Sequence, residues 1–336
     1  MSNAVRYDPL LVRYLSEELN ERLQGRLCTA APSFAPDLSV TLSLDRREQL
    51  RLDLHPSRGW FRILPTTDDD ELELDAVCTR IRAPADERLI EIQLHDNGRF
   101  RSQERTLILE LQTNQWNAIL RGEDGRIVSV LRARRAGSRS LHPGQLYDAP
   151  PPEQRLGATG ISRHNAHARW DEIVGTASVE ERRQLVLRSF AWTSAINVEW
   201  LLAPAADEDP EGLEKAFERW WYLLEEEPAR PCILKIGERL QPYPIRLKGV
   251  ENTPTATLLE AIARISVEQD EELDDPRLGA AQNLTRERLV GTGKKLERLR
   301  GELLGAGEAE KLRELGDLLL ARLHLVPRGA ARVTLE

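Results

Sequence analysis

Apolar residues recur at three- to four-residue spacing from Val12 to Leu23, which predicts an amphipathic helix near the start of the chain. Asp8 can accept a hydrogen bond at the beginning of this helix, and Pro9 fits the first helical position, where no amide donor is needed. Gly25 stands where a glycine commonly follows the end of a helix. The sequence therefore predicts a leading helix between Asp8 and Gly25.

Apolar and polar residues alternate along residues 38–132, which is typical of strands with one buried face. Asn97-Gly98 and Asp124-Gly125 are hairpin signals, because such turns require positive φ at their central residues. The expected strands are 38–44, 50–54, 60–63, 89–94, 106–111, 118–120 and 127–131. This region is predicted to form a mainly antiparallel sheet or sandwich.

Helical spacing returns after Pro150-Pro151-Pro152, which marks a domain boundary. Ser178 and Glu181 form a capping-box sequence that opens a helix through Phe190. Further helices are expected at 192–202, 210–224 and 257–265, with an extended stretch at 233–248 and a solvated acidic linker at 268–275. The middle of the chain is therefore predicted to be a helical module followed by a return segment.

Leucines near the C-terminus repeat as in a coiled coil. Leu289, Leu296 and Leu303 are seven residues apart, with Leu299 between them. Gly305-Ala306-Gly307 interrupts the pattern before leucines resume along residues 312–323. One straight rod and a kink or hairpin are both open interpretations.

These patterns place the chain in the α+β class. The expected parts are an antiparallel, sandwich-like sheet domain with a leading helix at 1–152, a helical module at 153–230, a return segment with the acidic linker at 231–280, and the start of a coiled coil at 281–336.

The net charge of the chain is unevenly distributed along the sequence. A formal charge of −8 argues against a uniformly basic nucleic-acid-binding protein, but residues 205–280 alone carry 9 Lys or Arg against 18 Asp or Glu. No Lys precedes Lys215, so the first 152 residues rely on Arg for positive charge. Arg is suited to bidentate phosphate contact, whereas a codon bias would give the same pattern, and both explanations are open.

The sequence lacks signals for secretion, membrane insertion and disulfide bonding. The N-terminal region has no apolar stretch of the kind found in a signal peptide, and no apolar run approaches the roughly 20 residues of a membrane helix. Cys28, Cys78 and Cys232 lack the short spacing of a zinc site or a disulfide framework. We therefore expect a soluble, cytoplasmic protein with reduced thiols.

Motifs for known catalytic chemistry are incomplete. Residues 291–295 resemble the end of a phosphate-binding loop, but Arg288 stands where the first glycine is required. His164, His167 and Asp171 offer half of a metal site without further ligands, and an exposed polar surface explains them better. No cofactor is expected, and an enzyme is disfavoured.

Several segments, taken in order along nearly the whole chain, match one pattern. They are 7–11 (YDPLL), 21–26 (ERLQGR), 54–58 (LHPSR), 87–90 (ERLI), Glu110-Leu111 with Asn117, Ile119 and Leu120, Arg139 with Pro143-Gly144, Tyr147 and Pro150-Pro151, and 315–321 (LGDLLLA) with Gly329. On these segments the chain is identified as a member of the NFACT family, which includes bacterial RqcH, also called fibronectin-binding protein A, and eukaryotic NEMF.

The resemblance implies a ribosome quality-control factor that has no catalytic activity of its own. Family members bind large ribosomal subunits that hold a peptidyl-tRNA, recruit a tRNA, and support template-free C-terminal tailing, with alanine and alanine tRNA in bacteria. The resemblance also implies a sheet domain like that of formamidopyrimidine-DNA glycosylases and a helix-hairpin-helix-like module. The chain begins Met1-Ser2-Asn3, without the glycosylases' proline nucleophile, so DNA is not an expected partner. The lack of a long apolar run means that a membrane is not expected either.

The sequence also departs from the family pattern. Glu87-Arg88 replaces an Asp-Arg pair, residues 113–116 replace a Gly-Arg-His-Ser run, and Trp192 replaces a glycine. The chain stops at Glu336, where the family continues into more coiled coil and a C-terminal RNA-binding domain. A truncated or diverged relative, acting as an RNA-binding or protein-interaction scaffold without tailing activity, is therefore an open alternative. The third alternative, adhesion to fibronectin, is disfavoured by the lack of a secretion signal.

Two groups of residues form the candidate RNA-binding site. The resemblance assigns tRNA contact to Asp8, Glu87 and Arg88, and an Arg–carboxylate pair is suited to the bases and phosphates of an unpaired loop. Each has a structural alternative, since Asp8 can cap a helix and Arg88 can pair with Glu87 or Asp86. The second group, the arginine strip, provides candidate phosphate contacts at Arg132, Arg134, Arg135 and Arg139, and a solvated surface with no ligand is the open alternative.

Overall fold

A computed structural model describes the chain in segments. They are residues 4–55, 58–66, 75–96, 103–112, 116–136, 139–205, 210–225, 229–273 and 311–325, with positions 288, 292, 293, 295 and 296. The chain divides into two compact units, Met1–Gln269 and Asp270–Glu336.

The predicted leading helix is confirmed as α1 (Pro9–Leu23). Asp8 is its N-cap, and the Oδ1 atom of Asp8 accepts a hydrogen bond from the Leu11 amide at 2.8 Å. Gly25 follows the helix with φ +81°, in the left-handed region that glycine adopts readily. The start and the end of this helix are therefore set by local sequence.

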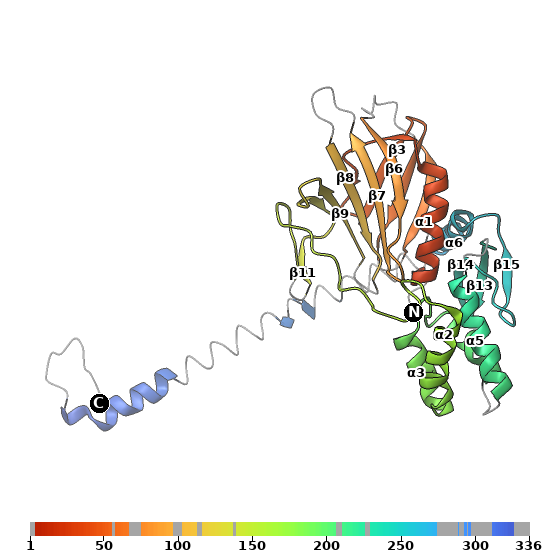
Figure 1. The fold of residues 1–336 in the computed structure, drawn as a ribbon. Coiled ribbons are helices and arrows are strands. Elements are labelled where there is room, and N and C mark those ends of the chain that lie inside the picture. Colours follow the sequence, from red (N-terminus) through yellow and green to blue (C-terminus); the bar gives the residue numbers. More distant parts are fainter. Residues whose placement is uncertain are drawn as a thin grey trace. The chain divides into compact units, whose positions relative to one another are not determined.

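The predicted antiparallel sheet is also confirmed. Its strand order is β10-β9-β8-β7-β6-β1-β3-β4-β5, with β2 paired to β3, and α1 lies against β6 and β7 (Figure 1). The strands are β1 (Leu27–Cys28), β2 (Ser33–Phe34), β3 (Ser39–Leu44), β4 (Glu48–Asp53), β5 (Trp60–Pro65), β6 (Ala76–Arg82), β7 (Leu89–Asp96), β8 (Gln103–Glu110), β9 (Asn117–Gly122) and β10 (Ile127–Val130).

Tyr7 fills the space between distant strands of this sheet. Its ring centroid lies 5.3 Å from that of Phe61 on β5 and 5.8 Å from that of Trp116, which precedes β9. Its hydroxyl donates to the Gly59 carbonyl at 2.6 Å. A Cβ atom on Gly59 would lie 2.3 Å from the Trp116 ring, so this contact requires glycine. Strand β5, which carries Phe61, and the segment before β9, which carries Trp116, are far apart in the strand order and approach one another around Tyr7.

A helical module follows the small hairpin of β11 (Arg134–Ala136) and β12 (Arg139–Leu141). Aromatic rings of Trp170, Phe190, Phe217 and Trp220 pack against one another in its core. Its elements are α2 (Arg163–Trp170), the π-helical turn Asp171–Gly175, α3 (Val179–Ser189), α4 (Val198–Leu202), the 3₁₀ turn Ala203–Ala205 and α5 (Pro210–Leu224).

The predicted helix at 192–202 is wrong over its first six residues, because α4 begins only at Val198. Trp192 has φ +65°, which is incompatible with a right-handed helix. The Oδ1 atom of Asn197 accepts a hydrogen bond from the Ser194 amide at 2.9 Å and stabilises a turn there instead. Side-chain hydrogen bonds therefore compete successfully with helix formation in this segment.

The return segment forms a small sheet and then a helix. β13 (Cys232–Ile236) pairs with β14 (Arg239–Tyr243) and β15 (Asn252–Pro254), and α6 (Leu258–Leu273) follows. The predicted acidic linker is wrong over residues 268–273, which continue α6. Glutamate, glutamine and leucine in this run have high helix propensity, so their acidity does not end the helix.

In the second unit, residues 311–321 are helical and their leucines are exposed. Leu296, also described, is exposed and helical. Leu289, Leu299 and Leu303 lie outside the described residues, so the coiled coil stays a prediction.

All three cysteines are unpaired in the structure, and each is buried. Burial raises the pKa of the Cys28 thiol to about 12 and the pKa values of the Cys78 and Cys232 thiols to about 11. Because the thiolate is the nucleophile, we expect native protein at pH 8 to resist iodoacetamide, whereas guanidinium-unfolded protein should be alkylated at all three cysteines. Mass spectrometry would measure this, and rapid alkylation of a cysteine in the native fold would contradict the described burial.

Candidate functional site

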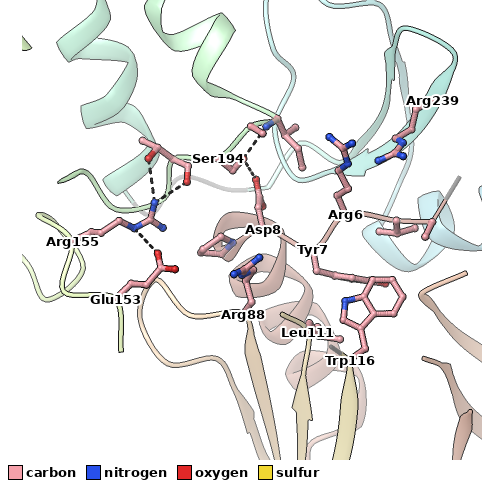
Figure 2. Close-up of a pocket in the computed structure, with 16 residues that line it drawn as sticks. Arg6, Tyr7, Asp8, Arg88, Leu111, Trp116, Glu153, Arg155, Ser194 and Arg239 are labelled. Atoms are coloured by element: carbon pink, nitrogen blue, oxygen red, sulfur yellow. Dashed lines mark hydrogen bonds and ion pairs between the residues drawn. The ribbon is translucent and has the colours of Figure 1, made fainter. Parts of the chain in front are cut away.

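A cavity of about 560 Å³ opens where the sheet, the helical module and the return segment meet (Figure 2). Four guanidinium groups and two carboxylates border it, together with apolar side chains. The lining residues are Ala4, Val5, Arg6, Tyr7, Asp8, Pro9, Arg88, Leu111, Trp116, Glu153, Arg155, Thr193, Ser194, Ala195, Ile196 and Arg239. Such a mixture suits a ligand with anionic and apolar parts.

Asp8 joins three parts of the chain at this cavity. Besides capping α1, its Oδ2 atom accepts hydrogen bonds from the Ser194 hydroxyl at 2.6 Å and from the Tyr243 hydroxyl at 3.0 Å. Burial raises the pKa of the Asp8 carboxyl, although these hydrogen bonds oppose the rise. The structural role of Asp8 is thus confirmed, and its contact with tRNA stays a prediction.

Asp86 forms the buried ion pair that joins the sheet to the helical module. Its carboxylate accepts hydrogen bonds from Nε and Nη2 of Arg155, each at 2.7 Å. Arg155 also donates through Nη1 to the carbonyl oxygens of Leu187 at 3.1 Å and Thr193 at 3.0 Å. Burial raises the pKa of the Asp86 carboxyl, and Arg155 opposes that rise. This bidentate pair fixes the loop before β7 against the helical module.

The backbone of Trp192 is held in the left-handed region by two of its neighbours. Its amide donates to Asp86 Oδ1 at 2.7 Å, and its carbonyl accepts a hydrogen bond from Asn197 Nδ2 at 2.8 Å. Glycine adopts positive φ without steric cost, so this backbone is consistent with the glycine that the resemblance leads one to expect at this position. The replacement by Trp therefore leaves a glycine-like backbone in place.

Glu87 and Arg88, predicted to act together, lie in different surroundings. The Oε1 atom of Glu87 accepts a hydrogen bond from the Glu153 amide at 2.8 Å, and burial raises the pKa of the Glu87 carboxyl. Arg88 lines the cavity near Asp8 (Figure 2), whereas Glu87 does not. The structure thus brings Asp8 and Arg88 together, and the tRNA contacts of all three stay predictions.

The arginine strip lies outside the lining of this cavity, and its members differ in exposure. Arg139 is only 9% exposed; it pairs with Glu110, and its Nε donates to the Asp148 carbonyl at 2.7 Å. Burial and the neighbouring Arg134 lower the pKa of Arg132, while Arg135 is exposed. Arg139 is therefore engaged by partners within the protein, whereas Arg135 is exposed at the surface. The RNA contacts of the strip stay predictions.

His167 lies between two carboxylates on the helical module. Its Nδ1 is 3.0 Å from Asp171 Oδ2, and its Nε2 is 2.7 Å from Glu214 Oε2. The hydrogen bond with Glu214, and secondarily the charge of Asp171, raises the pKa of His167.

His167 is therefore expected to stabilise the fold at acidic pH. A pKa raised above the unfolded value of about 6.5 gives stability that is fully present below that pH and is lost as pH rises through the folded pKa. Urea unfolding at pH 5.5 and pH 8.5 would measure this. At pH 5.5 the free energy of unfolding of wild type should exceed that of His167→Gln by no more than about 1 kcal/mol, because the ion pairs of His167 are partly exposed. An equal difference at both pH values would contradict this assignment.

Two further properties concern only the described part of the chain. Its side chains form no group of three or more His, Cys, Asp and Glu arranged to hold a metal ion. None of its helices is both long enough and apolar enough to cross a membrane.

Sequence reasoning missed several residues that shape the cavity. Arg6, Arg155 and Arg239 belong to no recognised motif, and Trp116 attracts notice only as a departure from the family pattern. Residues 113–115 of that departure lie outside the described residues. Asp86 adjoins the predicted pair, so only its position next to Glu87 pointed toward it.

Two solved structures share the fold of this chain. The fold is similar to the fibrinogen binding protein from Staphylococcus aureus, with a TM-score of 0.61 and 19% identity over 77% of this chain and 98% of that one. It is also similar to the N-terminal part of the fibronectin/fibrinogen-binding protein from Streptococcus suis, with a TM-score of 0.59 and 16% identity over 79% and 99%. These likenesses define the class of fold.

The chain belongs to the NFACT family, because the family's N-terminal and middle domains match residues 8–336. Two curated relatives, each named Rqc2 homolog RqcH and found in two strains of Streptococcus pneumoniae, are 23% identical to it over 352 residues. The match covers 98% of this chain and 60% of each relative. The chain thus spans less than two thirds of the length of these relatives.

Proposed function

We propose that this chain is the tRNA-binding part of a ribosome quality-control factor that acts in the cytoplasm on large subunits holding a peptidyl-tRNA. Family membership and the relation to RqcH support this class of function. The observation that carries the proposal within this chain is the cavity in which Arg88 lies near Asp8.

The chemistry of the cavity supports binding of an unpaired RNA loop. Guanidinium groups bind phosphates and the edges of bases, and apolar walls accommodate ribose or base surfaces. Arg88 supplies a cation at the cavity, while Asp8 and Ser194 fix the walls around it. Arg132, Arg134 and Arg135 would extend phosphate contact beyond the cavity.

The proposed role is binding rather than catalysis. In this scheme the ribosome performs peptidyl transfer, and the chain holds an alanine tRNA so that nascent chains receive C-terminal alanine tails. Neither a cofactor nor a metal is part of the proposal.

Co-sedimentation with purified large ribosomal subunits, with and without peptidyl-tRNA and over a salt series, tests the proposal. We expect co-sedimentation that requires the tRNA and weakens as salt rises, because each phosphate contact releases counterions. Equal binding with and without tRNA would favour a protein-interaction scaffold. No binding at low salt would contradict the proposal.

A further inference from the structure

Arg6 is held at the cavity by Gln241, a buried residue 235 positions later in the sequence. Its amide donates to Gln241 Oε1 at 3.0 Å, and Gln241 Nε2 donates to its carbonyl at 2.9 Å. Gln241 is fully buried, whereas Arg6 is exposed between buried Val5 and Tyr7. The backbone of Arg6 is thus fixed at the cavity, which Arg6 lines with an exposed side chain.

Arg239 lies beside Arg6 at the first position of β14 (Figure 2). Burial lowers the pKa of Arg239, and the positive charge of Arg6 lowers it further. Two guanidinium groups are therefore held together on one side of the cavity, where one bound anion can contact both.

The carboxylates around the cavity have other partners. Asp8 is bound by Leu11, Ser194 and Tyr243, and Glu153 lies 3.2 Å from Arg155. Within the described residues, no carboxylate contacts the Arg6 guanidinium.

We propose that Arg6 and Arg239 together form a subsite for one phosphate of an unpaired RNA strand that enters this cavity. Guanidinium groups bind phosphate through paired hydrogen bonds. The cavity volume of about 560 Å³ lies within the range of small-ligand sites and suits one nucleotide. Leu111, Trp116 and Ile196 line the same cavity and offer apolar surface to its ribose or base. This subsite deepens the proposed function and rests on it.

The test measures binding of the full chain to a fluorescent, chemically synthesised stem-loop RNA by anisotropy. The variants are Arg6→Gln, Arg239→Gln and the double variant, and thermal unfolding checks their fold. Arg246→Gln is the matched control, because Arg246 is exposed in the same return segment and does not line the cavity.

Each single variant should weaken binding about tenfold, as expected for loss of a charge-assisted phosphate contact. The double variant should lose less than the product of the two single losses, because both arginines hold one phosphate. It should also lower the slope of log affinity against log salt by about 0.7 for one single-strand phosphate. If the Arg6 and Arg239 variants show the same RNA affinities and the same salt slopes as Arg246→Gln, the proposed subsite is wrong.

A stem-loop with neutral methylphosphonate linkages in its loop tests whether the arginines contact phosphate. Wild type should bind this neutral RNA weakly, and the double variant should bind it with the same affinity as wild type. An equal loss on neutral and native RNA would overturn phosphate contact. Adding a 5′-terminal phosphate to the RNA should leave its affinity unchanged. A gain in affinity that requires both arginines would show that they bind a terminal phosphate, and it would overturn the proposal that they bind an internal one.

The same assay separates this inference from the proposed function. If Arg88→Gln weakens binding and the double variant does not, the Arg6–Arg239 subsite is wrong and the proposed RNA site stands. If wild type shows no salt-dependent affinity for RNA, both are wrong.

Discussion

Replacement of Asp86 by Asn is expected to lower the free energy of unfolding by about 3 kcal/mol, because the buried Arg155 guanidinium then keeps only Glu153, at 3.2 Å, as a counter-charge, and the Glu153 side chain is 53% exposed. The side chains of Asp86 and Arg155 are 0% and 7% exposed, so water cannot replace the lost carboxylate. Asn tolerates the φ of +59° at position 86, so the change removes charge without adding backbone strain. Urea unfolding followed by circular dichroism would measure the loss.

Asp124→Asn is the matched control. Asp124 is exposed in the turn between β9 and β10, and an Asn-Gly turn is equally suited to a hairpin, so its change should stay within about 0.5 kcal/mol. Asp86→Asn should also cost less in an Arg155→Gln background, where no buried charge is left alone. The same large loss in that background would contradict an ion-pair origin.

Arg88→Gln is expected to weaken tRNA binding by about 10- to 100-fold, which corresponds to loss of a hydrogen-bonded charged contact. Arg88 lines the cavity near Asp8, and the replacement removes its charge while keeping much of its stem. Anisotropy with labelled, deacylated tRNA at fixed salt would measure the affinity.

Arg80→Gln provides the comparison, since Arg80 is exposed on β6 and does not line the cavity. Both variants should unfold at nearly the wild-type urea concentration. Unchanged tRNA affinity in a folded Arg88→Gln protein would remove Arg88 from the proposed site, and a parallel loss in both variants would point to a non-specific charge effect.

Elements with local signals were predictable from the sequence. Asp8, Pro9 and Gly25 define α1 within a few residues, and Asp124-Gly125 correctly joins β9 to β10. The capping box is confirmed, with a Ser178 amide to Glu181 Oε2 distance of 3.3 Å. The Asn97-Gly98 turn lies outside the described residues, although β7 and β8 pair in antiparallel fashion as that turn requires.

Interactions between distant residues were not predictable in the same way. The family resemblance pointed to Asp8 and Arg88, which both line the cavity, but nothing local shows that Arg155 pairs with Asp86 or that Arg239 lies beside Arg6. Trp192 likewise adopts φ +65° through contacts with Asp86 and Asn197 rather than through its own propensity. Periodicity and capping thus locate the elements, whereas tertiary hydrogen bonds and charge pairing assemble the cavity.

The reciprocal bonds between Arg6 and Gln241 constrain the order in which the protein folds during its own synthesis. The N-terminal helix leaves the ribosome first, but Glu18 must wait for the amides of Leu258 and Leu259, which it binds at 2.7 and 3.0 Å. Such late partners slow folding, because the chain between them must be ordered first. The first unit can therefore close only after residue 259 has emerged, so the cavity forms late in the synthesis of that unit.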